Sequence, residues 1–380
     1  MTKACYVGVA GKARKVKKIY TGVDNKARKV KKAYVGVGGV ARPFFSAEQK
    51  LSYYGRVTGL DEGVGYLAAT AVGNYGLFGG GYNDGSPYAV YAYSTSLVRS
   101  TPTAMTDSRY DLAATTVGNY GLFGGGNSRL VKDHFRDTVD AYSTSLVRST
   151  PTALPEGRAV LAATSVGNYG LFGGGYIIIG DTYISYATVD AYSASLVRSS
   201  PTSLSEEKYG LSATSVGDFG LFGGGNDKTH KASSVVDAYS ATLVRSTPTA
   251  LSEARNQLAA TSVGGYALFG GGNGFDTVDA YSASLVRSTP IALSEARGGL
   301  AAATVGDYAL FGGGFDLDAQ SISTVDAYSA TLVRSTPTGL STTRGGLAAT
   351  SVGDYSLFGG GCHLNLYYNV VDAYTVDGGG

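Results

Sequence analysis

The sequence predicts an all-β fold: a seven-bladed β-propeller made of four-stranded antiparallel blades. The motif Leu-Phe-Gly-Gly-Gly occurs seven times, beginning at Leu77, Leu122, Leu171, Leu221, Leu268, Leu310 and Leu357. Successive copies are 45, 49, 50, 47, 42 and 47 residues apart, a period typical of propeller blades. The chain has 56 Gly and 29 Tyr, with no continuous helical period, which favours short strands joined by tight turns.

Each repeat divides into four expected strands. In the fifth unit they cover residues 258–263, 266–269, 277–281 and 285–288. Gly264 and Gly265 form the first turn, because glycine tolerates positive φ. The glycine triplet ends the second strand, and a loop of variable length precedes the third.

The seventh unit predicts how the propeller closes. It ends after Val371-Asp372-Ala373-Tyr374 without the Leu-Val-Arg-Ser segment that supplies a fourth strand elsewhere. Residues 50–54, just before the first unit, fill that place. We expect this N-terminal strand to complete the blade begun at the C-terminus, which removes an exposed sheet edge.

The glycine run, the Tyr of the third strand and the Arg before the next first strand resemble kelch repeats over roughly residues 46–375. Kelch units usually carry Trp six residues after that Tyr, whereas this chain has Arg in the pairs Tyr142/Arg148, Tyr192/Arg198, Tyr239/Arg245, Tyr281/Arg287 and Tyr328/Arg334. Arginine can cover a tyrosine ring and still reach water. The sequence therefore predicts kelch-like geometry with a different packing unit between blades.

Charge separates residues 1–45, a basic β-repeat segment, from the propeller of residues 46–380. The first segment holds 12 of the 31 Lys and Arg and one of the 29 acids, a net charge of +11, whereas the remainder carries −9. Tyr-x-Gly-Val recurs every 14 residues, at Tyr6, Tyr20 and Tyr34, and predicts successive β-hairpins. So short a segment buries little surface alone, so we expect it to attach to a partner.

The attachment residues are predicted to be Tyr6, Tyr20, Tyr34, Lys15 and Arg28, and the partner to be other structural proteins of a particle, the propeller or another copy. The repeats resemble those of tail-associated structural proteins of phages and prophages. Two Lys-Ala-Arg-Lys-Val-Lys-Lys runs leave nucleic acid open as a partner. Without a recognisable nucleic-acid module, a solvated or protein-facing surface is the favoured interpretation.

Enzymatic motifs are missing from the sequence: there is no Gly-x-Ser-x-Gly elbow, P-loop or His-Glu-x-x-His. The recurring Asp140, Asp190, Asp237, Asp279, Asp326 and Asp372, with Arg158, Arg255, Arg297 and Arg344, are expected to hold blades together rather than to catalyse. Kelch-like copper oxidases need paired His and Tyr ligands, but the three His lie in separate loops. We predict no enzyme, no metal site and no cofactor.

The loops after the second strands are where the repeats differ, so they are the predicted binding face. Tyrosines there offer large contact area at low entropic cost and stack on sugar faces, and the isoleucines at 177–179 argue for a contact surface. The candidate ligand-binding residues are Tyr82, Asn83, Asp84, Tyr88, Arg129, His134, Arg136, Tyr176, Asp181, Tyr183, Tyr186, His230, His363, Tyr367 and Tyr368.

The sequence thus favours a non-enzymatic recognition or structural protein, a phage or phage-derived tail component that binds a host surface glycan or protein. No signal peptide and no membrane-spanning run are visible, so the expected location is a virion or other extracellular particle, and otherwise the cytoplasm. The alternative is an intracellular interaction propeller whose basic arm binds an acidic partner or nucleic acid. A homo-oligomer is compatible with either.

Overall fold

The computed structural model describes residues 50–83, 85, 88–128 and 134–377, and the backbone of six strands within residues 6–46. The chain divides into two compact units, residues 1–52 with 376–380, and residues 53–375. The described residues are strands, turns and connections without a helix. None of them belongs to a helix that could cross a membrane.

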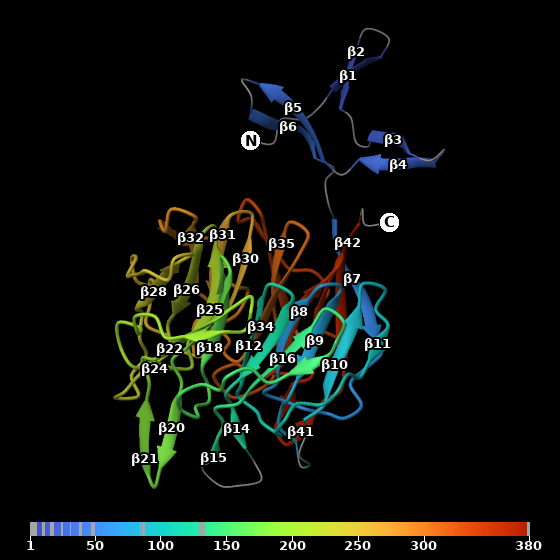
Figure 1. Ribbon diagram of the computed structural model, residues 1–380. Helices are drawn as coiled ribbons and strands as arrows, with labels where there is room; N and C mark the ends of the chain where they lie inside the picture. Colours follow the sequence, from blue (N-terminus) through green and yellow to red (C-terminus); the bar gives the residue numbers. More distant parts are fainter. Residues whose placement is uncertain are drawn as a thin grey trace. The chain divides into compact units, whose positions relative to one another are not determined.

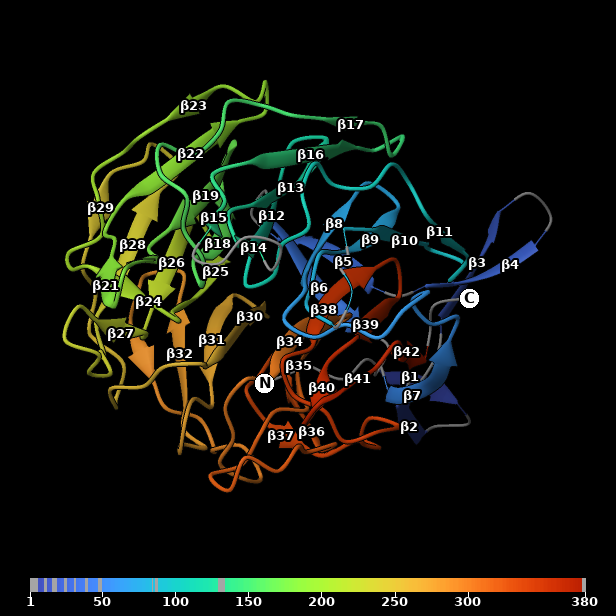
Figure 2. The same ribbon diagram turned by 90° about the horizontal axis from the view of Figure 1, so that it is seen from below.

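The second unit is a seven-bladed propeller of four-stranded antiparallel sheets, as predicted (Figures 1 and 2). From the inner to the outer strand, blade 1 comprises β8 (Ala68–Val72), β9 (Tyr75–Gly79), β10 (Val90–Ser94) and β11 (Arg99–Ser100). Blade 2 comprises β12 (Ala113–Val117), β13 (Tyr120–Gly124), β16 (Val139–Ser143) and β17 (Arg148–Ser149). Blade 3 comprises β18 (Ala162–Val166), β19 (Tyr169–Gly173), β22 (Val189–Ser193) and β23 (Arg198–Ser199).

The remaining blades have the same order. Blade 4 comprises β25 (Ser212–Val216), β26 (Phe219–Gly223), β28 (Val236–Ser240) and β29 (Arg245–Ser246), and blade 5 comprises β30 (Ala259–Val263), β31 (Tyr266–Gly270), β32 (Val278–Ser282) and β33 (Arg287–Ser288). Blade 6 comprises β34 (Ala301–Val305), β35 (Tyr308–Gly312), β36 (Val325–Ser329) and β37 (Arg334–Ser335). Blade 7 comprises β38 (Ala348–Val352), β39 (Tyr355–Gly359), β42 (Val371–Asp377) and β7 (Lys50–Val57).

Blade 7 confirms the predicted closure, since β7 from the N-terminal side is its outer strand, paired with β42. Tyr53 fixes this strand: its hydroxyl donates to Asp372 over 2.7 Å, and its ring lies 5.3 Å from that of Tyr374. Both chain ends therefore contribute to one sheet, and each inner strand lies beside the inner strand of the next blade all round the ring.

The fourth strands are shorter than expected. In blade 5 the strand covers only Arg287–Ser288, because the turn after the third strand extends through Val286. Leu285 has a φ of +60°, and Ser282 bonds the backbone of both Leu285 and Val286. The side chain of Leu285 packs on the core from this left-handed position, which places it outside the strand.

The Leu-Phe-Gly-Gly-Gly motif joins neighbouring blades. A Cβ on Gly173, the first glycine of its triplet, would lie 2.8 Å from Cε1 of Phe222 in the next blade. The same approach recurs round the ring, from Gly79 against Phe123 to Gly359 against Phe78. Each such Phe also packs edge-on against the third-strand Tyr of its own blade, as Phe222 does against Tyr239 at 5.9 Å. The contact between neighbouring blades is therefore made by the Phe of one blade packed against the first glycine of the triplet in the preceding blade. We call this contact the glycine–phenylalanine wedge.

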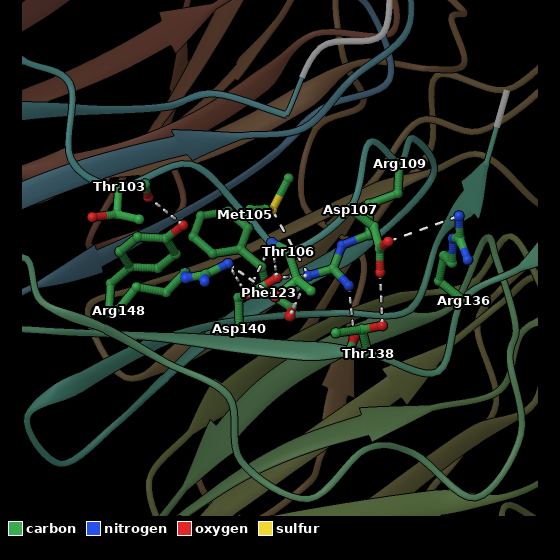
Figure 3. A network of polar contacts seen from close by, with 11 residues as sticks. Thr103, Met105, Thr106, Asp107, Arg109, Phe123, Arg136, Thr138, Asp140 and Arg148 are labelled. Atoms are coloured by element: carbon green, nitrogen blue, oxygen red, sulfur yellow. Dashed lines mark hydrogen bonds and ion pairs between the residues drawn. The ribbon is translucent and has the colours of Figure 1, made fainter. Parts of the chain in front are cut away.

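The recurring aspartate is a buried hub rather than an exposed acid (Figure 3). In blade 2, Asp140 accepts from Arg109 Nη2 at 2.6 Å, and both side chains are fully buried. The Thr106 hydroxyl donates to it at 2.7 Å and Arg148 at 3.4 Å. Since Thr106 and Arg109 lie on the connection from blade 1, the hub fastens that connection to blade 2.

The outer arginine does not take the position expected from the sequence. Tyr142 and Arg148 face each other in register, but the guanidinium binds Asp140. Among the described residues, a guanidinium lies over a ring only in blade 1, where Arg99 is 5.4 Å from the Tyr91 centroid. Tyr91 stands there at the aspartate position, so this Arg has no hub carboxylate to bind and pairs instead with Asp61 at 2.5 Å.

The first unit contains the three predicted hairpins, described by their backbone. The antiparallel pairs are β1 (Tyr6–Val9) with β2 (Lys12–Lys15), β3 (Ile19–Val23) with β4 (Lys26–Val30), and β5 (Lys32–Val37) with β6 (Val40–Ser46). Tyr6, Lys15, Tyr20, Arg28 and Tyr34 lie on these strands, and their side chains fall outside what the structure describes.

Candidate ligand-binding face

The variable loops and the blade-to-blade connections share one end of the propeller, because both lie where the second strand of each blade ends. Short accessory strands mark this end, and Figure 1 shows β14, β15, β20, β21 and β41 along its lower side. They pair as β14 (Asn127–Ser128) with β15 (His134–Phe135), β20 (Tyr176–Ile179) with β21 (Thr182–Ser185), β24 (Lys208–Tyr209) with β27 (Asn226–Asp227), and β40 (Cys362–His363) with β41 (Leu366–Tyr367). Figure 2 views this face directly.

A closed circuit of backbone hydrogen bonds surrounds the propeller axis on this face. Each N–H donates to the carbonyl of the corresponding residue in the preceding blade, over 2.7–3.1 Å. All seven residues are left-handed, with φ between +53° and +65°. We call them the axial ring: Tyr66, Asp111, Val160, Gly210, Gln257, Gly299 and Gly346.

The axial ring brings unlike side chains together. Three members are glycine, which suits the left-handed conformation, but Tyr66, Asp111, Val160 and Gln257 are not. Neighbours touch: a Cβ on Gly346 would lie 3.1 Å from Cε1 of Tyr66, and one on Gly210 would lie 3.8 Å from Cγ1 of Val160. The ring therefore places Tyr66, Asp111 and Val160 in sequence on one side of the axis.

Asp111 is the acidic member of the axial ring. Burial raises the pKa of its carboxyl to about 7, although the residue is only half-buried and keeps some contact with solvent. Among the residues that the structure describes, none donates a hydrogen bond to this carboxylate or forms an ion pair with it. Burial, followed by the charge of Asp111, raises the pKa of Tyr110 and raises that of Tyr176 to about 12. Tyr110 precedes Asp111 in the chain, and Tyr176 pairs with Ala159, the residue before Val160 of the axial ring.

An arc of aromatic rings extends outward from the axial ring. Tyr82 contacts Tyr110 at 5.0 Å and Tyr367 at 5.6 Å between ring centroids. Across the next blade, Phe135 contacts Tyr176 at 5.6 Å. Residues of blades 7, 1, 2 and 3 and of the connection between blades 1 and 2 thus form two groups of contacting rings on this face.

Four rings in this arc form a closed quartet in which each contacts the next. Going round, the centroid distances are 5.3 Å from Tyr176 to Tyr183, 5.1 Å to His230, 6.1 Å to Tyr209 and 5.0 Å back to Tyr176. The Tyr209 hydroxyl and His230 Nδ1 are hydrogen-bonded at 2.8 Å. Tyr183 is 47% exposed, so the quartet presents aromatic surface to solvent.

Several predicted ligand residues instead hold the loops in place. Asn83 is buried, donates to Glu62 at 2.9 Å and accepts from the Gly85 N–H at 2.7 Å. Arg136 donates to Ser128 at 3.3 Å and lies 3.8 Å from Asp107. His363 Nδ1 and the Ser321 hydroxyl are 2.8 Å apart, which ties the loops of blades 6 and 7.

The other predicted ligand residues are distributed over the same face. Asp181 is exposed at the tip of the β20–β21 hairpin, and Tyr88 is exposed in the blade 1 loop. Tyr186 and Tyr368 are half-buried, and their backbones bond those of Gly175 and Gly361. His134 lies on β15, and its side chain falls outside what the structure describes, as do residues Asp84 and Arg129 as a whole.

The sequence analysis did not identify the residues that the blade-to-blade connections contribute to this face. Tyr66, Tyr110, Asp111 and Tyr209 come before the first strand, in segments that look like shared framework. These residues stand one or two positions before the Leu that precedes each first strand, and their identity there differs between blades. That variation at a fixed position is the sequence signal that could have identified them. The hub partners Arg109 and Lys208 were missed in the same way; Lys208 takes the arginine position in blade 4, 3.2 Å from Asp237.

Grouped metal ligands do not occur in the described part of the chain, where no cluster of three or more His, Cys, Asp or Glu side chains is found. Cys362 is buried with a free thiol beside Tyr66, and burial raises the pKa of that thiol. The predicted pair Cys362-His363 therefore points to two different neighbours, Tyr66 and Ser321.

Comparison with known proteins places the fold and no more. The chain matches none of the protein-family models and none of the curated proteins. Solved structures do resemble it; one, titled "Structure of YjhT", has a TM-score of 0.59 at 12% sequence identity and covers 74% of this chain and 99% of that chain. At that identity the likeness establishes the propeller architecture alone.

Proposed function

We propose that this propeller is a non-enzymatic recognition protein that binds its ligand on the face bearing the axial ring and the aromatic arc. The observation that carries the proposal is the contrast between the two parts of each blade. The glycine–phenylalanine wedge recurs in every blade and the aspartate hub in nearly every one, whereas this face holds rings that differ from blade to blade. Aromatic side chains on a rigid scaffold favour recognition.

The repeated charged residues support a non-catalytic role. Arg109 and Asp140 are fully buried and bind each other within the blade framework. Arg297 and Asp326 are buried in the same way, with Nη2 and Oδ2 2.8 Å apart. A catalytic acid or base has to reach a substrate proton, and these groups are covered by the blade itself. The acid–base set suggested by the repeat is thus committed to holding the fold.

The ligand that fits this face best is a host surface glycan or protein. Tyr176, Tyr183 and Tyr209 offer ring faces for sugars together with hydroxyls for hydrogen bonds. Ile179, which is 61% exposed on the projecting β20–β21 hairpin, adds apolar contact surface. With the kelch-like repeats and the tail-like N-terminal repeats, this supports a phage or phage-derived tail component attached to a particle through residues 1–45.

A second candidate follows from the charge of the first unit. Its net charge of +11 favours an acidic partner, and an intracellular interaction propeller with a basic arm would use it. The loop face would then be a secondary contact. The two functions differ in which unit carries the binding energy.

Pull-down with bacterial cell walls separates them. We expect the full chain to bind walls of its host, and Tyr183→Ala to weaken binding on the order of tenfold. Tyr54→Ala is the matched control, since Tyr54 is an exposed Tyr packed on Tyr355 near the first turn of blade 7, at the other end of the strands. Loss of binding in Lys15→Glu/Arg28→Glu but not in Tyr183→Ala would favour the basic arm. Failure to bind any candidate host surface would contradict the recognition function.

A further inference from the structure

The axial ring contains backbone strain that the fold does not require. Every member has a left-handed backbone, and Gly210, Gly299 and Gly346 show that glycine satisfies the geometry. A non-glycine residue is disfavoured there, and a β-branched one such as Val160 is a marked outlier. Core packing supports a left-handed Leu285, but the non-glycine residues of the axial ring are half-buried or exposed and are absent from the hydrophobic clusters of the described blades. Unexplained strain of this kind clusters at functional sites. The identities of Tyr66, Asp111 and Val160 therefore call for a role beyond folding.

The acidic side chain of Asp111 indicates which kind of ligand group the axial ring could bind. The backbone of Asp111 lies in the ring between Tyr66 and Val160, and its carboxylate lacks a hydrogen-bond donor or cation among the described residues. Burial raises the pKa of the phenols of Tyr66, Tyr110 and Tyr176, and the charge of this carboxylate adds to the rise. Tyr66 adjoins Asp111 in the axial ring, Tyr110 precedes it in the chain, and Tyr176 pairs with the residue before Val160. A half-buried carboxylate without a donor or cation among the described residues can accept a positive group from a ligand.

The aromatic rings near the carboxylate favour an organic ammonium group as the cation. An ammonium group gains from ring faces as well as from the negative charge. Tyr176 belongs to the aromatic quartet and pairs with Ala159, whose neighbour Val160 bonds Asp111 in the axial ring, so a ring-shaped ligand lying on the quartet can direct a substituent to Asp111.

We propose that the axial ring binds the free amine of an amino sugar, with Asp111 as the counter-ion, Tyr66 and Tyr110 around the ammonium group, and Tyr176 under the sugar. This inference rests on the proposed recognition function and narrows its ligand to a glycan with unacetylated amines. Because hydrogen bonds to charged groups are among the strong ones, loss of this contact should weaken binding by on the order of tenfold or more.

The test is a matched pair of ligands that differ only in the amine. Glucosamine oligomers are titrated calorimetrically into the full chain at pH 7.5 beside N-acetylglucosamine oligomers. We expect binding of the first and at least about tenfold weaker binding of the second, with Asp111→Asn losing the preference for the amine. Asn keeps the shape and tolerates the left-handed backbone, and thermal melting checks that the variant is folded.

Asp218→Asn is the control, because Asp218 is an exposed acid in the first turn of blade 4, at the other end of the strands. A second readout follows the Asp111 carboxyl by carbon NMR, and bound amine should lower its pKa. Equal binding of the two oligomers, or no binding while cell walls are still retained, would overturn this inference and leave recognition standing. Binding of polylysine without glucosamine oligomers would overturn the sugar assignment. Loss of wall binding as well would overturn both proposals.

Discussion

Val64 and Tyr91 belong to one hydrophobic cluster shared by blades 7 and 1, at the two positions that Arg109 and Asp140 fill with a buried ion pair in blade 2. Both partners have changed together, so neither an unpaired Arg nor an unpaired Asp is left behind. Blade 1 thus shows that the blade geometry tolerates an apolar pair in place of the hub.

Removing one hub partner in blade 2 should therefore cost more than replacing both. We expect Arg109→Val or Asp140→Tyr alone to lower the free energy of unfolding by about 3–5 kcal/mol, because a buried charge loses its partner. The double variant recreates the blade 1 pair and should cost less than either single change. Urea denaturation of the four proteins measures this, and strictly additive costs would contradict it. Arg148→Ala, at the partly exposed side of Asp140, should cost only about 1 kcal/mol.

The glycine wedge makes a second prediction. Gly173→Ala places a Cβ about where Phe222 Cε1 approaches to 2.8 Å, and overpacking of this kind costs about 1–3 kcal/mol. Adding Phe222→Leu should recover part of that loss, although the same change in the wild-type protein should be destabilising because it leaves a gap. Thermal melting of the single and double variants gives the coupling. A double variant as unstable as the sum of its parts would show that the blades are not limited by this contact.

Closure of the ring can be tested at one hydroxyl. Tyr53→Phe removes the donor to Asp372 and keeps the ring beside Tyr374, so the unfolding free energy should fall by about 1–3 kcal/mol. Tyr54→Phe, the neighbouring exposed residue, should leave stability unchanged. Deleting residues 46–56 should lower the melting temperature far more, since it exposes the edge of β42. An unchanged melting temperature for the deletion would contradict closure by β7.

The propeller was predictable because its signals repeat. Seven glycine triplets fixed the blade count, and the missing fourth strand after Tyr374 pointed to β7. The ends of the fourth strands were not predictable, since Leu285 takes a left-handed backbone that sequence patterns assign to glycine. Its packing on the core stabilises a conformation that local preference disfavours.

The site was harder to predict for a different reason. The loops of Tyr82, Tyr176 and Tyr367 were identified because they differ in length between blades. Asp111 and Tyr66 were missed because they stand at a fixed offset in the framework, where only their side chains vary. Their convergence depends on the closed circuit of hydrogen bonds, and seven segments far apart in the sequence meet at the axis only after the ring has closed.

Asp111 predicts a pH dependence of stability. Its pKa rises from 3.8 to about 7 on folding, so between these values the folded protein holds a proton that the unfolded chain has released. The free energy of unfolding should fall as the pH rises through this interval and level off above about pH 7. Asp111→Asn should remove this component, so the difference between variant and wild type, from denaturation curves at several pH values, should grow and then level off. A constant difference would contradict the raised pKa.

Strain in the axial ring makes the last prediction. Val160→Gly relieves a left-handed β-branched residue, worth about 1–2 kcal/mol, against about 0.4–1 kcal/mol for the added freedom of glycine in the unfolded chain. The variant should be more stable than the wild type by about 0.5–1 kcal/mol. Val147→Gly, at an exposed valine without positive φ, should bring no gain. Lower stability of Val160→Gly would show that the packing of this side chain outweighs its strain, whereas higher stability with weaker ligand binding would tie the strain to function.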